Sequence, residues 1–156
     1  MLISKKNRTM KSISLKKRFL DQFTIQELHE ESKIWLSTIA FWKDEVKFMY
    51  HLINENFVYF LSIDEKGSLN ALLKKINEIE KNKLDTLKTE VIHHEKTLSD
   101  YLKYSKELDE EKFKNDHEAI SKEFDFFQNN YRLMKSEIFR FAENVLKKKD
   151  TKQIAS

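Results

Sequence analysis

Apolar and aromatic residues recur at alternating steps of four and three over the last third of the chain. The repeat occupies ten positions, and the one that is neither apolar nor aromatic is His117. An average spacing of 3.5 residues is typical of a helix packed along its length against other helices. The pattern therefore predicts a long helix with these buried positions: Phe113, His117, Ile120, Phe124, Phe127, Tyr131, Met134, Ile138, Phe141 and Val145.

Two earlier segments carry the same pattern. The first runs from Ile25 to Ile53, and the second runs from Leu69 to Leu108 with a shift of register across residues 80–83. Such a shift resembles a stutter, which unwinds a supercoil locally without ending the helix. The three patterns predict helices over residues 24–61, 68–107 and 110–148.

Turn residues separate these helices unequally. The single glycine, Gly67, stands before Ser68 and favours a turn there, with Ser68 as a helix cap. Asp109 precedes two acidic residues and is a second cap candidate. Since no Gly or Pro enforces that second break, one continuous helix from Ser68 to Lys148 is the alternative.

Three rods of similar length joined by short connections favour one architecture. We expect an all-α fold, an up-down-up antiparallel three-helix bundle with coiled-coil-like heptad packing. The bundle would occupy residues 23–149, after a disordered basic tail at 1–22 and before a frayed C-terminus at 150–156.

Additional apolar residues flank two of the predicted seams. They are explained either by a helix that touches two neighbours within one bundle or by a homodimer face. The sequence leaves both interpretations open for Leu36, Phe41, Phe48 and Leu52 in the first helix, and for Phe126, Leu133, Phe139 and Leu146 in the third.

Composition excludes several classes of site. The chain has one Gly, no Pro and no Cys, so disulfides, thiolate metal sites and glycine-rich phosphate loops are excluded. No apolar run approaches the roughly 18–20 residues of a membrane span, and the first twenty residues lack the features of a secretory signal. A cytoplasmic protein is the expectation.

Positive charge is concentrated at the N-terminus. Seven cationic side chains precede the first acid, Asp21, and leave 22 basic and 26 acidic residues in the remainder. Such a tail could bind phosphates of nucleic acid or anionic lipid, or it could serve only as a solubilising extension. Whether translation starts at Met1 or Met10 decides how much of it exists. The candidate anion-binding residues are Lys5, Lys6, Arg8, Lys11, Lys16, Lys17 and Arg18.

One stretch of the first helix resembles a known group of proteins. Trp35-Leu36 is followed by Phe41-Trp42-Lys43-Asp44-Glu45-Val46 and by Phe48. This arrangement resembles small helical, functionally uncharacterised proteins of flavobacteria and their relatives. The resemblance is best over the first helix and implies a compact helical bundle, without an activity or ligand.

Few residues suggest catalysis. A di-iron carboxylate site in a helical bundle needs two Glu-x-x-His pairs. Glu90 and His93 supply one pair, but Gln26 replaces the ligand at the start of the other. The neighbouring Asp44 and Glu45 point about 100° apart on a helix and do not converge.

Two histidines, His94 and His117, occupy seam positions. Counted from the predicted turns, they fall several turns apart and cannot share a metal. We expect each to be partly exposed, with its polar tip in water or near a carboxylate such as Glu90.

These observations favour a non-catalytic structural or protein-interaction module, with no cofactor, metal or small-molecule substrate. A protein partner or self-association is the expected interaction. The alternative is binding of nucleic acid or an anionic membrane surface through the basic tail, and a di-iron enzyme comes third.

Overall fold

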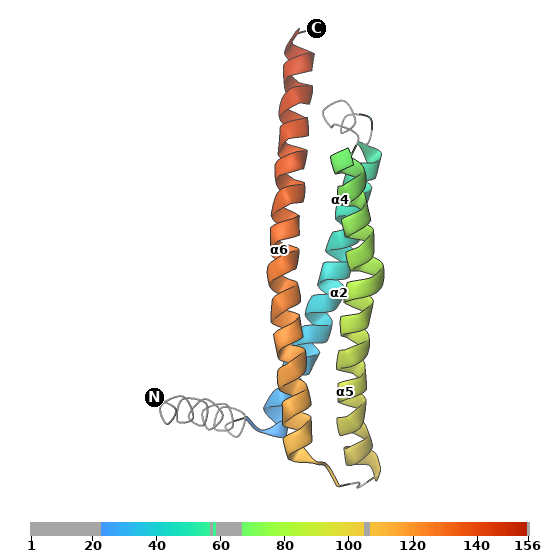
Figure 1. Ribbon diagram of the computed structural model, residues 1–156, viewed down its shortest axis with the longest axis vertical. Helices are drawn as coiled ribbons and strands as arrows, with labels where there is room; N and C mark the ends of the chain where they lie inside the picture. The colour runs from blue at the N-terminus through green and yellow to red at the C-terminus, as the bar shows by residue number, and fades with distance from the viewer. Residues whose placement is uncertain (1–22, 57, 59–66, 105–106, 156) are drawn as a thin grey trace, which may run out of the picture.

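The computed structural model describes residues 23–56, 58, 67–104 and 107–155, and its described regular structure is helical throughout. Figure 1 shows the helices as long rods lying side by side. The first rod is α2 (Ile25–Glu55). The second comprises α4 (Gly67–Glu78), the π-helical segment η1 (Ile79–Lys83) and α5 (Leu84–Tyr104), and the third is α6 (Glu110–Ala155). The all-α prediction is confirmed.

Thr24 fixes the start of α2. Its hydroxyl accepts a hydrogen bond from the backbone N–H of Glu27 at 3.2 Å, and the Glu27 carboxylate accepts one from the Thr24 backbone at 2.9 Å. This reciprocal capping box satisfies two N–H groups that have no partner inside the helix. The predicted end of this helix near residue 61 lies outside the described residues.

The second rod remains helical through the predicted register shift. Residues Ile79–Lys83 form a π-helical turn, the N–H of Leu84 bonds to the carbonyl of Ile79, and α5 follows directly. A π turn accommodates one extra residue, so the apolar positions on both sides can face the same core. Gly67, which was expected in a turn, is the first residue of α4.

A short connection separates α5 from α6. Asp109 caps the new helix, since its carboxylate accepts a hydrogen bond from the N–H of Lys112 at 3.0 Å. The alternative of one continuous helix from Ser68 is therefore wrong. α6 continues past the predicted end at Lys148 to Ala155, into the segment expected to be frayed.

The predicted seam positions form the core. Of the nine seam positions predicted from Ile25 to Ile53 of α2, eight are buried and Ile25 is partly buried. Nine of the ten on α6 are buried, and Phe141 is partly buried. The main cluster extends along most of the bundle, and a smaller one joins Leu28, Leu98 and Phe113 at the end where α6 begins.

Ion pairs and hydrogen bonds between helices show which of their residues lie side by side. His29 pairs with Glu95 and Lys43 with Asp85, so residue numbers rise along α2 as they fall along α5. Glu45 of α2 accepts hydrogen bonds from Tyr131 and Lys135 of α6 at 2.8 and 2.7 Å.

The predicted register between the second and third helices was wrong. His94 lies against His117, whereas counting from the predicted turns placed them several turns apart. The cause is the connection: α5 ends at Tyr104 and α6 begins at Glu110, so residues assigned to the end of the second helix belong to the link instead.

Candidate functional site

A buried polar chain links α5, α6 and α2 near the end of the bundle where α6 begins. His94 Nε2 lies 3.1 Å from His117 Nδ1, and His117 Nε2 lies 2.8 Å from Glu31 Oε2. The histidines are only 5% and 3% exposed, while the Glu31 carboxylate reaches solvent. The expectation of two separate, partly exposed histidines was therefore wrong.

The partners determine where the protons lie when both rings are neutral. An ionised Glu31 carboxylate is acceptor-only, so His117 Nε2–H donates to it. His117 Nδ1 then holds a lone pair, and His94 Nε2–H donates to that atom. The two hydrogen bonds thus point the same way, from α5 through α6 to α2.

Burial keeps His94 neutral. Desolvation is the main cause that lowers the pKa of His94 to about 4, and the nearby His117 adds to the effect. Asp116 acts in the opposite direction, whereas His93 lowers the pKa further. At neutral pH the His94 ring is therefore an uncharged hydrogen-bond donor within the core.

Aromatic rings hold both imidazoles in place. The ring of His117 stacks on Trp35 with centroids 4.5 Å apart, and that of His94 stacks on Phe113 at 4.1 Å. Trp35 also stacks on Phe124. Since each imidazole is fixed by a stacking ring and a hydrogen bond, the pair is a rigid part of the core.

Two further buried polar groups are sequence neighbours of residues in the Glu31–His117–His94 chain. Ser32, next to Glu31, is fully buried, and its hydroxyl finds no hydrogen-bond partner among the described residues. Glu95, next to His94, pairs with His29 through one oxygen, and its other oxygen is buried without a partner among them.

Replacing Ser32 with alanine is expected to raise the free energy of unfolding by about 1 kcal/mol, because it removes a buried hydroxyl that gains no hydrogen bond on folding. Urea denaturation at pH 7.5 measures the change. Ser37→Ala, an exposed site on the same helix, is the matched control and should have little effect. A loss of stability in Ser32→Ala would show that the hydroxyl has a partner in solution.

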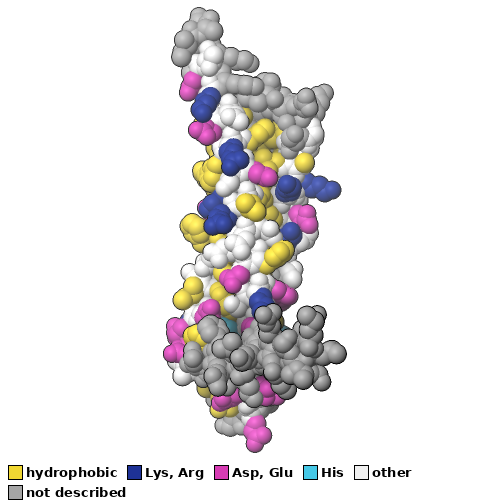
Figure 2. All heavy atoms as spheres, turned by 60° about the vertical axis from the view of Figure 1, so that its left-hand side comes forward, with side chains coloured by type: hydrophobic (Ala, Val, Ile, Leu, Met, Phe, Trp, Pro, Cys, Tyr) yellow, Lys and Arg dark blue, Asp and Glu magenta, His cyan; other side chains and the backbone are white. Residues whose placement is uncertain are grey.

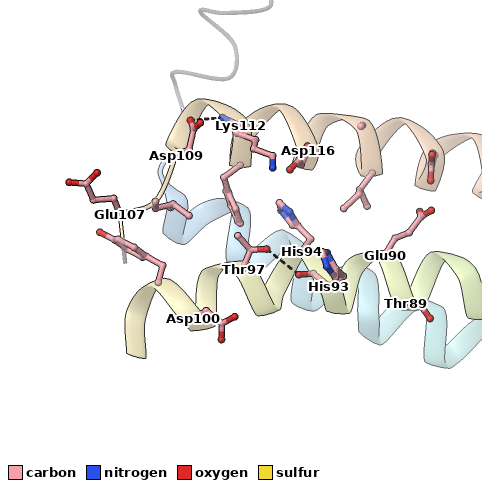
Figure 3. Close-up of a pocket in the computed structure, with 16 residues that line it drawn as sticks. Thr89, Glu90, His93, His94, Thr97, Asp100, Glu107, Asp109, Lys112 and Asp116 are labelled. Atoms are coloured by element: carbon pink, nitrogen blue, oxygen red, sulfur yellow. Dashed lines mark hydrogen bonds between the residues drawn. The ribbon is translucent and has the colours of Figure 1, made fainter. Parts of the chain in front are cut away.

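An open groove of about 750 Å³ lies beside His94, between α5 and α6. In Figure 3, Glu90 and His94 point from α5 toward α6, whereas Thr89 and Asp100 point away from α6. Six carboxylate residues line the groove together with His93 and Lys112: Glu90, Asp100, Glu107, Asp109, Asp116 and Glu123. Its lining is therefore strongly acidic.

Two carboxylate residues, Glu90 of α5 and Glu123 of α6, line both this groove and a second pocket beside it. The hydrogen bond with Glu123 is the main cause that raises the pKa of Glu90 to about 7, and partial burial contributes. Two carboxylates this close cannot both ionise without repulsion. Glu90 therefore takes up a proton at a higher pH than an ordinary glutamate.

A smaller, largely apolar pocket of about 300 Å³ adjoins the groove at Glu90 and Glu123. It lies where the π-helical turn η1 faces the middle of α6. Ile79 and Leu87 line one side, and Phe126, Phe127 and Tyr131 line the other.

The two segments considered for a di-iron site, residues 26–29 and 90–93, make different contacts. Glu90 and His93 both line the groove, while His29 of the second sequence match pairs with Glu95. Among residues 23–56, 58, 67–104 and 107–155, no group of three or more His, Cys, Asp or Glu side chains could hold a metal ion. Within the same residues, no helix has the length and hydrophobicity to cross a membrane.

The seven tail cations predicted to bind anions, Lys5 to Arg18, lie outside the described residues. The comparisons with known proteins also give no further information on the site: no family model matches, and no curated protein or solved structure matches significantly.

Sequence reasoning missed the histidine pair although it placed both histidines in seams. The available signal was that Ser32, His94 and His117 are the polar residues at core positions of three successive helices. Recognising a shared layer required the register across the α5–α6 connection, which periodicity alone does not supply.

Proposed function

We propose that this protein is a non-catalytic structural or protein-interaction module that works in the cytoplasm. Its scaffold would be an up-down-up antiparallel bundle whose seams follow a heptad repeat. The level pairs between helices and the buried seam residues support this arrangement. Membership of the flavobacterial group of small helical proteins stays a prediction that fits the same scaffold.

The observation that carries the proposal is an apolar stripe on the outside of α2. Ile34, Phe41 and Phe48 repeat every seven residues and are 64%, 63% and 61% exposed. Residues seven apart lie on one face of a helix. Binding of another protein over a row of large exposed apolar side chains is favourable, because their apolar surface is removed from water.

The buried histidine chain fits a structural role. His94 and His117 are enclosed by Phe113 and Trp35, and their Nε2 atoms are occupied by hydrogen bonds within the bundle. A polar layer of this kind favours one alignment of the helices, because any slip leaves buried polar atoms unsatisfied.

Affinity capture from cells that express the protein tests the proposal. We expect a specific protein to be retained by the wild type after nuclease treatment and lost with Phe41→Ser/Phe48→Ser. Leu102→Ser, which alters a 70% exposed leucine on α5, is the control and should retain it. Loss of all bound material after nuclease treatment would instead support nucleic-acid binding through the basic tail.

A further inference from the structure

Two large apolar side chains protrude from the middle of α6 on one face. Phe126 is 72% exposed and Leu133 is 64% exposed. They stand seven residues apart, and Asn130 lies between them at helical spacing, so the three residues form one stripe of about two turns. This stripe differs from the one on α2, because it adjoins the side of α6 that faces α5.

An apolar hollow accompanies the stripe. The 300 Å³ pocket beside η1 is lined by Phe126 and Asn130 themselves, and Ile79, Leu87 and Phe127 also contribute to it. Cavities of about 150 Å³ already hold a benzene ring, so an aromatic side chain has room here. The same face thus presents both a protruding apolar group and a cavity that could receive one.

Charge is distributed oppositely on the two sides of this stripe. Residues 110–125 of α6 contain six acidic and three basic side chains, whereas residues 132–149 contain six basic and two acidic ones. Residues 126–131 between them carry no charge. Figure 2 shows the same trend over the visible surface, with Lys and Arg gathered above and Asp and Glu predominating below.

We propose that this face binds a second copy of the chain, with the two α6 helices antiparallel. The inference rests on the proposed interaction role and names the partner for this face. A two-fold axis near Asn129 and Asn130 places Phe126 of one copy beside the partner's Leu133. The same contact is made twice, as a self-complementary interface requires.

Charge complementarity selects the antiparallel orientation. With the axis midway between Phe126 and Leu133, the acidic part of each α6 lies along the basic part of the other, and Ala119 lies level with the partner's Arg140. A parallel arrangement would instead set like charges against each other, which opposes association. The uncharged middle of each helix meets its own copy at the axis.

Sedimentation equilibrium of the full chain over about 1–200 μM tests the association. We expect the wild type to form dimers that weaken by at least tenfold in Phe126→Ser/Leu133→Ser. The matched control is Leu102→Ser/Tyr104→Ser, which changes two residues of α5 that are 70% and 68% exposed and should dimerise like the wild type. A wild type that stays monomeric over this range overturns the inference, as does an equal effect of both double variants.

Disulfide cross-linking tests the orientation, and the absence of native cysteine makes single replacements unambiguous. Under mild oxidation, Asn130→Cys is expected to cross-link to itself, because it lies next to the axis. Ala119→Cys and Arg140→Cys should not do so separately but should cross-link when mixed. Self-cross-linking of Ala119→Cys and Arg140→Cys would indicate a parallel dimer and contradict the proposal.

Failure of this inference and failure of the proposed function are distinguishable. A monomeric protein that still captures a partner through Phe41 and Phe48 would refute the dimer and keep the interaction role. Circular dichroism of each serine variant checks that its helix content and melting temperature match those of the control. Weaker dimerisation can then be distinguished from unfolding of the variant.

Discussion

Replacing Trp42 with alanine is expected to lower the free energy of unfolding by about 3–5 kcal/mol, the range for large aromatic side chains removed from a core. Trp42 is 6% exposed. Its ring packs on three aromatic rings of α6, those of Phe124, Phe127 and Tyr131, with centroids 5.0–5.5 Å away. The alanine leaves a cavity in the contact between α2 and α6 that these rings cannot fill by small movements.

Guanidinium denaturation at a fixed low protein concentration measures the loss. The control is Phe41→Ala on the neighbouring residue, which is 63% exposed and should change the free energy by less than about 0.5 kcal/mol. Ile138→Ala and Phe127→Ala, two further core truncations on α6, should cost about 2–5 kcal/mol each. Equal effects of Trp42→Ala and Phe41→Ala would contradict the arrangement of α2 in the bundle.

The buried faces could be predicted from the sequence because their period is a local property. Each seam residue of α2 and α6 repeats at three- and four-residue steps, and those steps identify one face whatever the neighbouring helix is. The sequence also predicted a change of register across residues 80–83, and the π-helical turn at Ile79–Lys83 lies at the same place.

The periodicity does not determine the axial register of one helix relative to the next, that is, which residues of the two helices lie side by side. That depends on how many residues cross the connection, and neither Gly nor Pro marks the link between Tyr104 and Glu110. The error separated His94 from His117 and turned a buried hydrogen-bonded pair into two unrelated residues. The groove depends on the same register, because its walls come from α5 and α6.

Acidification is expected to destabilise the fold through His94. Its pKa is about 4 in the folded chain and about 6.5 in the unfolded chain. Between these values the unfolded state binds a proton that the folded state does not, so the free energy of unfolding falls as the pH falls from about 6.5 to 4. A difference of this size corresponds to a loss of about 3 kcal/mol when the interval is fully traversed.

Glu90 opposes this effect in part of the same interval. Its pKa is raised to about 7 beside Glu123, so here the folded state binds the extra proton between about pH 7 and 4.5. Protonation of Glu90 therefore stabilises the fold as the pH falls through this range. Because the two effects oppose each other, the free energy of unfolding of the wild type should change less with pH than His94 alone or Glu90 alone would make it change.

Two variants separate the contributions. In His94→Gln, the side-chain amide can still donate to His117 Nδ1, but it does not titrate. In Glu90→Gln, the repulsion with Glu123 is removed. Between pH 7.5 and 4.5, we expect the free energy of unfolding to fall by about 2–3 kcal/mol less in His94→Gln than in the wild type. In Glu90→Gln, it should fall by more than in the wild type.

Urea denaturation at half-unit pH steps gives these profiles, and comparison between variants cancels the titration of exposed carboxylates common to all of them. The charged groups near His94 come from each neighbouring helix: His117 and Asp116 from α6, Glu31 of α2 through its bond to His117, and His93 from α5 itself. Because Asp116 favours the protonated ring and the two histidines disfavour it, burial decides the sign. Parallel profiles for the wild type and His94→Gln below pH 6.5 would mean that water reaches the His94 ring, which is incompatible with its stacking against Phe113 inside the core.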